Sequence, residues 1–153
     1  MIYVLALLIG VVAGLRAMMA PAIVSWSARV GALGLRGTWL GFLGSAWVTW
    51  LFTLLALAEL VTDQLPRTPR RTVPIQFATR VATGALSGAA IALARGSWIG
   101  GGLAGMAGAA IGTLGGRAAR ARTAAALGRD RPAAILEDVI AIGGGLLIVA
   151  ASS

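Results

Sequence analysis

The sequence is divided into long apolar runs that carry very few charges, and this pattern limits the folds open to the chain. Residues 37–58 and 97–116, for example, contain no charged residue at all. A helix needs about 20 mostly apolar residues to cross the hydrocarbon core of a membrane. The alternation of apolar and polar residues that is typical of barrel strands is absent. The pattern therefore predicts an all-α, polytopic transmembrane helical bundle.

The composition supports a location in the membrane. Apolar residues of the set AVILMFWYC make up 58% of the 153 residues, and only 12% are charged. A soluble domain carries about 25% charged residues, which it needs to form its polar surface. Intrinsic disorder requires low hydrophobicity and is excluded by the same numbers. We therefore expect one transmembrane domain, residues 1–153, that contacts the lipid bilayer.

We predict about five spans, with four or six as the alternatives. They cover about residues 2–25, 37–60, 73–94, 97–116 and 133–151, and the cytoplasmic loops lie at about 63–72 and 117–132. No basic residue precedes the first run, unlike in a signal peptide, so we interpret it as a retained span. Gly14, Pro21 and Gly31 are candidate break or hinge positions there. They could divide this region into a short span and an interfacial or re-entrant helix, giving a broken first helix.

The arginines predict an orientation. In the five-span topology, the loops at 63–72 and 117–132 share one side and hold eight arginines, against three on the other side. Cytoplasmic loops carry an excess of basic residues, so the N-terminus is predicted to be cytoplasmic. The net charge of +8 is then explained by anionic lipid head groups rather than by nucleic acid. The stretch from Arg117 to Arg131 is similar to an amphipathic surface helix ending at Gly128.

Glycines recur at spacings of three and four residues in the third and fourth spans. They are Gly84, Gly88, Gly101, Gly105, Gly108, Gly112 and Gly116. Small residues at this spacing form a flat helix face that another backbone can approach closely. The spacing predicts glycine-zipper packing, with a pore lining or a moving helix interface as the alternative.

Three missing residue types narrow the chemistry. The chain has no Cys and no His, and all 13 basic residues are Arg. Disulfides, thiolate nucleophiles and lysine Schiff bases are thereby excluded, and the commonest general base is missing. We predict no catalytic residue, no cofactor and no metal site, and so no enzyme. A metal-dependent lipid enzyme that uses carboxylates with Mg²⁺ remains an alternative, although no metal-binding spacing in the sequence is specific.

Ionisable residues inside or at the ends of spans are the candidate ion- or solute-binding residues, because each is costly to bury. Glu59 and Asp63 are four residues apart and share a helix face at the end of the second span. Glu137 and Asp138 open the fifth span, where adjacent positions allow only one of them to face the centre. Arg80 lies about 9 Å into the third span from its start. These side chains could meet at one depth in the membrane.

Two further groups of residues need partners or ligands. Arg16 lies about 21 Å along the first span, too deep to reach the surface easily. It must find a carboxylate, free backbone carbonyls near the Gly14 and Pro21 break, or an anionic ligand. The segment 63–74 contains three prolines, among them the break candidate Pro66, and is predicted to be a stiff turn. It presents three candidate lipid-head-group residues, Arg67, Arg70 and Arg71.

Several motifs together resemble a known family. In order, they are Gly14-Leu15-Arg16-Ala17 with Pro21-Ala22, Glu59-Leu60-Val61-Thr62-Asp63-Gln64-Leu65-Pro66, Gly128-Arg129-Asp130-Arg131-Pro132, and Glu137-Asp138. This combination resembles the bacterial membrane family called domain of unknown function 4126. The resemblance implies a small integral protein of the bacterial cytoplasmic (inner) membrane, and it assigns no activity to any residue.

Two interpretations of the buried charges remain open. In the functional one, the carboxylates form an ion or proton site, and Arg80 and Arg16 act as counter-charges or bind an anion. The chain is then a small transporter or channel-like protein for a small ion or polar solute, and it acts as a homo-oligomer. In the structural one, the charges pair with one another. The chain is then a non-transporting membrane scaffold, or a protein that binds lipids or partners.

Overall fold

Helices make up nearly all of the chain that the computed structural model describes, which is residues 1–63, 73–93, 95–128 and 130–152. Their order is α1 (Ile2–Leu15), α2 (Met19–Val30), the short 3-10 helix η1 (Gly41–Gly44), α3 (Ala46–Thr62), α4 (Pro74–Leu93), α5 (Trp98–Leu127) and α6 (Asp130–Ser152). Within these residues there is no strand, so the all-α prediction is confirmed. The candidates Pro66, Arg67, Arg70 and Arg71 lie outside the described residues.

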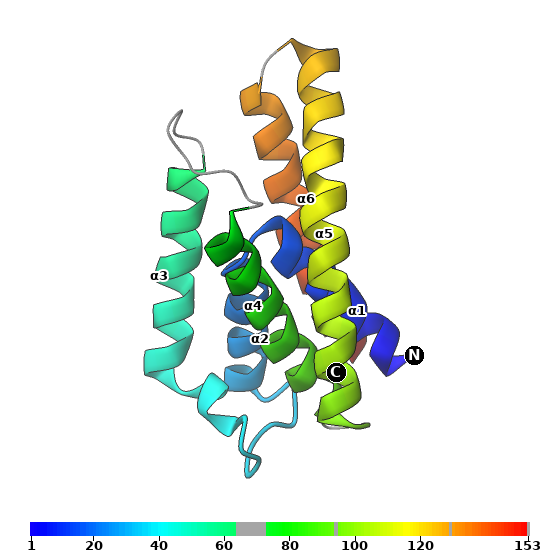
Figure 1. Ribbon diagram of the computed structural model, residues 1–153. Helices are drawn as coiled ribbons and strands as arrows, with labels where there is room; N and C mark the ends of the chain where they lie inside the picture. The colour runs from blue at the N-terminus through cyan, green and yellow to red at the C-terminus, as the bar shows by residue number, and fades with distance from the viewer. Residues whose placement is uncertain (64–72, 94, 129, 153) are drawn as a thin grey trace.

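The first two helices enter the bundle from the same end and meet in its interior (Figure 1). At the start of α1, the Tyr3 hydroxyl accepts a hydrogen bond from the Ser97 N–H, 3.1 Å away, just before α5 begins. Beyond the end of α2, the ring of Trp39 packs edge-on against Trp98, with 5.3 Å between ring centroids. The chain therefore turns back between α1 and α2 and returns to the end where α5 starts.

The predicted first span, 2–25, is thus two helices with a sharp turn between them. Arg16 follows α1 with an extended backbone, φ −138° and ψ 108°, which ends the helix. Pro21 lies in the first turn of α2, where its missing N–H costs no hydrogen bond. Gly31 then ends α2 in the left-handed conformation, φ 85°, a conformation that glycine adopts without strain.

Two predicted boundaries are corrected by the structure. The predicted second span, 37–60, is helical only from Ala46, because 37–45 contains three glycines and Gly37 adopts φ 80°. The stretch 117–132, predicted as a loop that resembles a helix ending at Gly128, is helical to Leu127 as a continuation of α5, which ends at Gly128, φ 67°. Residues 117–127 are Ala, Arg, Thr and Leu with no Gly or Pro, and Ala and Arg favour helix.

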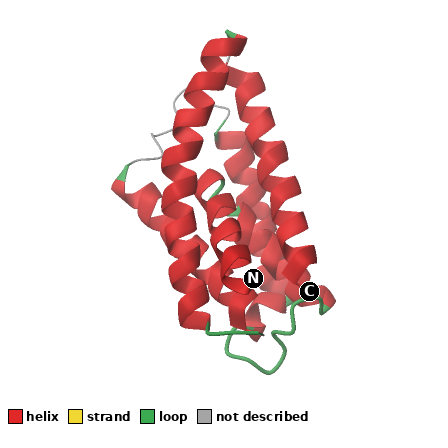
Figure 2. Ribbon diagram, turned by 90° about the vertical axis from the view of Figure 1, so that its right-hand side faces the viewer, coloured by secondary structure: helices red, strands yellow, loops and turns green. Residues whose placement is uncertain are grey.

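Within the part of the chain that the structure describes, two helices are long and apolar enough to cross a membrane. They are the stretches Trp98–Ala126 of α5 and Pro132–Ser152 of α6. α1 and α3 are shorter apolar helices of 14 and 17 residues. α5 and α6 lie side by side over most of their length, and both termini lie toward the end of the molecule that carries the 31–45 connection (Figure 2).

Helices α1, α4 and α5 pack with their backbones in contact, and glycine makes this possible. A Cβ atom on Gly10 would overlap the carbonyl oxygen of Gly105, and one on Gly105 would overlap the carbonyl oxygen of Gly84. Gly88 meets the Gly101 carbonyl in the same way. No side chain larger than hydrogen fits at these contacts. Two further glycines of α5, Gly108 and Gly112, approach the α1 backbone at Leu7 and Val11. α5 therefore packs closely against both α1 and α4, which also contact each other.

Candidate functional site

The turn between α1 and α2 exposes two helix ends to the interior, and two charged side chains satisfy them. A helix C-terminus leaves carbonyl groups without partners, and an N-terminus leaves N–H groups. Arg80 of α4 donates from Nη1 to the carbonyl oxygens of Gly14 (2.9 Å) and Leu15 (2.8 Å). The positive charge of Arg80 is the sign that the C-terminal end of the α1 helix dipole favours.

Glu59 of α3 binds the start of the second helix. Its Oε1 accepts a hydrogen bond from the Ala17 N–H (2.7 Å), and its Oε2 accepts one from the Met18 N–H (2.8 Å). Its Oε1 also lies 3.3 Å from Nη2 of Arg80. One ion pair therefore joins the groups that bind the two helix ends, and it connects α3 and α4 at the turn.

Arg16 lies in the turn itself and pairs with two aspartates. Its Nε donates to Oδ1 of Asp138 on α6, 2.6 Å away, and its Nη1 pairs with Asp63 at the end of α3. The Arg16 side chain is fully buried. Of the partners considered for this residue, the structure provides carboxylates, and it provides them from two different helices.

These contacts bring together most of the candidate ion- or solute-binding residues that were named from the sequence. We call Arg16, Glu59, Asp63, Arg80 and Asp138 the turn cluster. Arg16 and Arg80 are 0% and 2% exposed, and buried charges are tolerated only when they are paired and hydrogen-bonded. Five helices, α1, α2, α3, α4 and α6, are thereby joined at one point by charged groups. Whether these residues bind an ion or solute stays a prediction.

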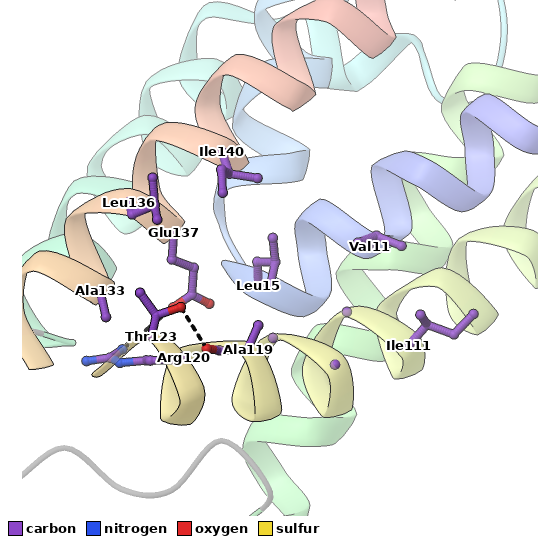
Figure 3. Close-up of a pocket in the computed structure, with 13 residues that line it drawn as sticks. Val11, Leu15, Ile111, Ala119, Arg120, Thr123, Ala133, Leu136, Glu137 and Ile140 are labelled. Carbon is purple, nitrogen blue, oxygen red and sulfur yellow. Dashed lines mark hydrogen bonds and ion pairs between the residues drawn. The ribbon is translucent and has the colours of Figure 1, made fainter. Parts of the chain in front are cut away.

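Glu137, the neighbour of Asp138, faces another direction. Its Oε2 lies 3.7 Å from Nη1 of Arg120, and both side chains line an open-sided groove of about 290 Å³ between α5 and α6 (Figure 3). Val11 and Leu15 of α1 form part of its wall. Adjacent positions on a helix point in different directions, so α6 serves the turn cluster with Asp138 and the groove with Glu137.

Thr113 belongs to the same region and was missed by sequence reasoning. Its hydroxyl lies 2.8 Å from the Ala109 carbonyl oxygen and 3.3 Å from that of Gly14. The Gly14 carbonyl thus has both Arg80 and Thr113 beside it. The signal available in the sequence was that Thr113 is the only hydroxyl-bearing residue between 98 and 116.

Three buried serines also escaped the sequence analysis. In the part of the chain that the structure describes, the hydroxyls of Ser25, Ser27 and Ser87 have no hydrogen-bond partner. A hydroxyl in a helix can bond to the backbone carbonyl four residues earlier. Six threonine hydroxyls make this bond elsewhere in the structure, those of Thr49, Thr53, Thr79, Thr83, Thr113 and Thr123.

The fold and the site together define a class: an all-helical protein whose first two helices meet at a buried cluster of ion pairs. The chain belongs to the family described as Domain of unknown function (DUF4126), which matches residues 3–152. The resemblance drawn from the sequence motifs is thereby confirmed. No curated protein and no solved structure matches the chain.

Proposed function

We propose that the chain is an integral membrane protein of the bacterial inner membrane that moves a small ion or polar solute. The observation that carries this proposal is the meeting of two helix ends in the interior, bound by Glu59 and Arg80 beside the buried Arg16. In secondary transporters, the ends of discontinuous helices form the ion and solute sites. Ionisable residues within membrane segments commonly mark a pathway.

The outer faces of the helices support the membrane location. Large apolar side chains are exposed on the long helices, among them Leu54 and Leu57 of α3, Leu114 of α5, and Leu146 and Leu147 of α6. Soluble monomers rarely expose large contiguous apolar patches. In the proposal, these side chains contact lipid, and the contacts between α1, α4 and α5 form the glycine zipper of the bundle.

The depth of the turn also supports the proposal. Gly14 lies beside Thr113, and Thr113 is about 22 Å along α5 from Trp98 at helical rise. The hydrocarbon core is about 30 Å thick. With Trp98 at one interface, the turn cluster lies inside the membrane, about three quarters of the way across. Charges held at this depth are available to a solute that has lost most of its water.

The proposed topology has four crossings, α3 to α6, and a re-entrant pair, α1 and α2. It replaces the five-span expectation, and four was one of the alternatives considered. The eight arginines of the connection between α3 and α4 and of the adjoining ends of α5 and α6 still share one side, which the positive-inside rule makes cytoplasmic. Both termini then lie on the opposite, external side, which revises the cytoplasmic N-terminus expected from five spans.

We expect single cysteines to report this orientation directly, because the chain has no Cys of its own. In intact cells, a membrane-impermeant thiol reagent is expected to label Ile2→Cys at the start of α1 and Arg36→Cys in the connection after α2. Arg122→Cys near the end of α5 is expected to be labelled only after the cells are opened. Protection of Ile2→Cys in intact cells would restore the cytoplasmic N-terminus and the odd number of crossings.

Within the proposal, Glu59 and Asp63 form the ion or proton site, with a second contribution from Asp138 or Glu137. Arg80 and Arg16 supply counter-charge or bind an anion. A single chain of 153 residues encloses little of a pathway, so the protein is proposed to act as a homo-oligomer. Glu59, Asp63 and Asp138 each already bind part of the turn, so a solute that competes for one of them also loosens the contact between the two helix ends.

We expect Glu59→Gln and Asp63→Asn each to lower ion flux at least tenfold in vesicles reconstituted with the purified protein. The charge that attracts a cation or carries a proton is removed, while the shape of the side chain is kept. Flux is measured as proton entry with a trapped pH-sensitive dye and as chloride entry with a trapped chloride-sensitive dye. Arg122→Gln, an exposed charge change on α5, is the control. Unchanged flux in both carboxylate variants contradicts the site assignment.

A non-transporting scaffold is the second candidate, and the pairing of the buried charges favours it. Both Arg16 and Arg80 have carboxylate partners among the described residues. In this alternative the cluster only joins helices, and the basic residues Arg67, Arg70 and Arg71 bind lipid head groups or a partner. If neither wild type nor the variants give dye-reported flux above that of empty vesicles, the scaffold function is the correct one.

A further inference from the structure

The groove between α5 and α6 is apolar along most of its length and polar at one end (Figure 3). Its polar side chains are Arg120, Thr123 and Glu137, which lie together. The remaining lining residues are apolar or glycine: Val11, Leu15, Ile111, Gly112, Gly115, Gly116, Ala119, Ala133, Leu136 and Ile140. A ligand that fits such a groove has a long apolar part and one polar end.

The dimensions fit a chain rather than a compact ligand. On α5 the lining runs from Ile111 to Thr123, which is about 18 Å at helical rise. One leaflet of a bilayer contributes about half of the 30 Å hydrocarbon core, or about 15 Å. The groove therefore has the length of one acyl chain in one leaflet. It also lies on the two helices that are long and apolar enough to cross a membrane, so lipid is what adjoins it there.

We propose that this groove binds one acyl chain of an anionic phospholipid, whose phosphate pairs with Arg120. This inference rests on the membrane location put forward above. The side chain of Arg120 is 18% exposed and carries five N–H donors, so it can serve Glu137 and a phosphate together. Arg117 and Arg122 lie exposed on the same stretch of α5 and add positive charge, which favours an anionic head group over a zwitterionic one.

The site is connected to the turn cluster. Leu15 lines the groove, and its own carbonyl oxygen accepts a hydrogen bond from Arg80. Glu137 lines the groove, and the next residue, Asp138, pairs with Arg16. A bound acyl chain therefore contacts the last residue of α1 and Glu137, the neighbour in sequence of the aspartate that binds Arg16. The lipid stabilises the arrangement in which the two helix ends meet.

Two glycines provide a matched pair for the test. An added Cβ at Gly115 or at Gly143 would meet no atom within 4 Å, so both accept a side chain without clashing with the protein. Gly115 lines the groove, and Gly143 on α6 does not. Gly115→Leu therefore fills the groove, and Gly143→Leu is the control. Ala119→Leu is a second filling variant, used if Gly115→Leu does not give the circular dichroism and melting curve of the folded protein.

The purified full chain in detergent is titrated with phosphatidylglycerol, phosphatidylcholine or glycerol phosphate, and bound lipid is counted by native mass spectrometry. Wild type and Gly143→Leu are expected to retain phosphatidylglycerol in preference to phosphatidylcholine. Gly115→Leu or Ala119→Leu is expected to raise the phosphatidylglycerol concentration for half occupancy at least tenfold. Arg120→Gln is expected to remove the preference between the two lipids, and glycerol phosphate is expected not to compete.

Three outcomes overturn the inference. Wild-type lipid retention by the filled variants shows that the groove is not the site. Full competition by glycerol phosphate shows a phosphate site without a chain. A wild-type dimer that Gly115→Leu converts to monomer, with lipid retention unchanged, shows that a second copy of the chain covers the groove. The titration needs no ion gradient, so its result stands apart from the flux of Glu59→Gln.

Discussion

Arg16→Met is expected to lower the free energy of unfolding by about 3–5 kcal/mol, the cost of removing one partner from a buried ion pair. Without the guanidinium, Asp63 and Asp138 face each other in the interior with no cation between them. The total stability of a domain is only about 5–15 kcal/mol, so much of the chain unfolds under mild conditions. The change is measured by thermal and denaturant unfolding of the detergent-solubilised protein, followed by circular dichroism.

A charge-balanced variant distinguishes the contribution of the ion pairs of Arg16 to stability from the contribution of its side-chain packing. Combining Arg16→Met with Asp63→Asn and Asp138→Asn removes the uncompensated charges, so it is expected to recover more than half of the lost stability. Arg122→Met removes an exposed arginine and is expected to change stability by less than about 0.5 kcal/mol. A triple variant less stable than Arg16→Met alone would show that the two aspartates stabilise the fold through groups other than Arg16.

Gly105→Ala is expected to destabilise the bundle by about 3 kcal/mol or more, at the upper end of the cost of overpacking. Its Cβ would overlap the carbonyl oxygen of Gly84 and lie 3.2 Å from Cα of Gly88, and backbone atoms cannot move aside as a flexible side chain can. The glycines of α1, α4 and α5 would then be forced apart. Thermal unfolding of the purified protein measures the effect.

Gly102→Ala is the matched control, on the same helix and one turn away. An added Cβ at Gly102 meets the Ala85 carbonyl oxygen at 3.7 Å and the Ala89 Cβ at 3.9 Å, which are ordinary contacts. Because alanine favours helix over glycine by about 1 kcal/mol, this variant is expected to be as stable as wild type or more so. Equal effects of the two substitutions would mean that the close backbone contact at Gly105 does not hold the helices together.

The turn cluster was largely predictable from the sequence, and the reason is electrostatic. A charged residue within an apolar run has few ways to avoid the cost of burial, so Arg16 and Arg80 had to meet the few carboxylates near the ends of other runs. The chain has only five acidic residues, which left few pairings. The particular choice of Glu59 for Arg80 and of two aspartates for Arg16 depends on helix rotation, which the sequence does not reveal.

The path of the first two helices was not predictable in the same way. Residues 2–25 have the length and apolarity of one crossing, and Gly14 and Pro21 mark a break without showing which way the chain continues. The direction is decided by contacts with distant segments, such as Tyr3 with Ser97. The role of Glu59 was hidden for a related reason, because it binds the backbone N–H groups of Ala17 and Met18, which have no side-chain signature in the sequence.

The contacts of α1 also determine when during synthesis the protein can be completed. The Gly14 carbonyl oxygen is bound by Arg80, 66 residues later, and has Thr113 beside it, 99 residues later. Arg16 is bound by Asp138, 122 residues later. A helix of 14 residues is too short to cross a bilayer alone, so in the proposed topology α1 depends on contacts with helices that are made later. Arg16 can pair with Asp63 once α3 has been made, but its second carboxylate, Asp138, is supplied only by the last helix.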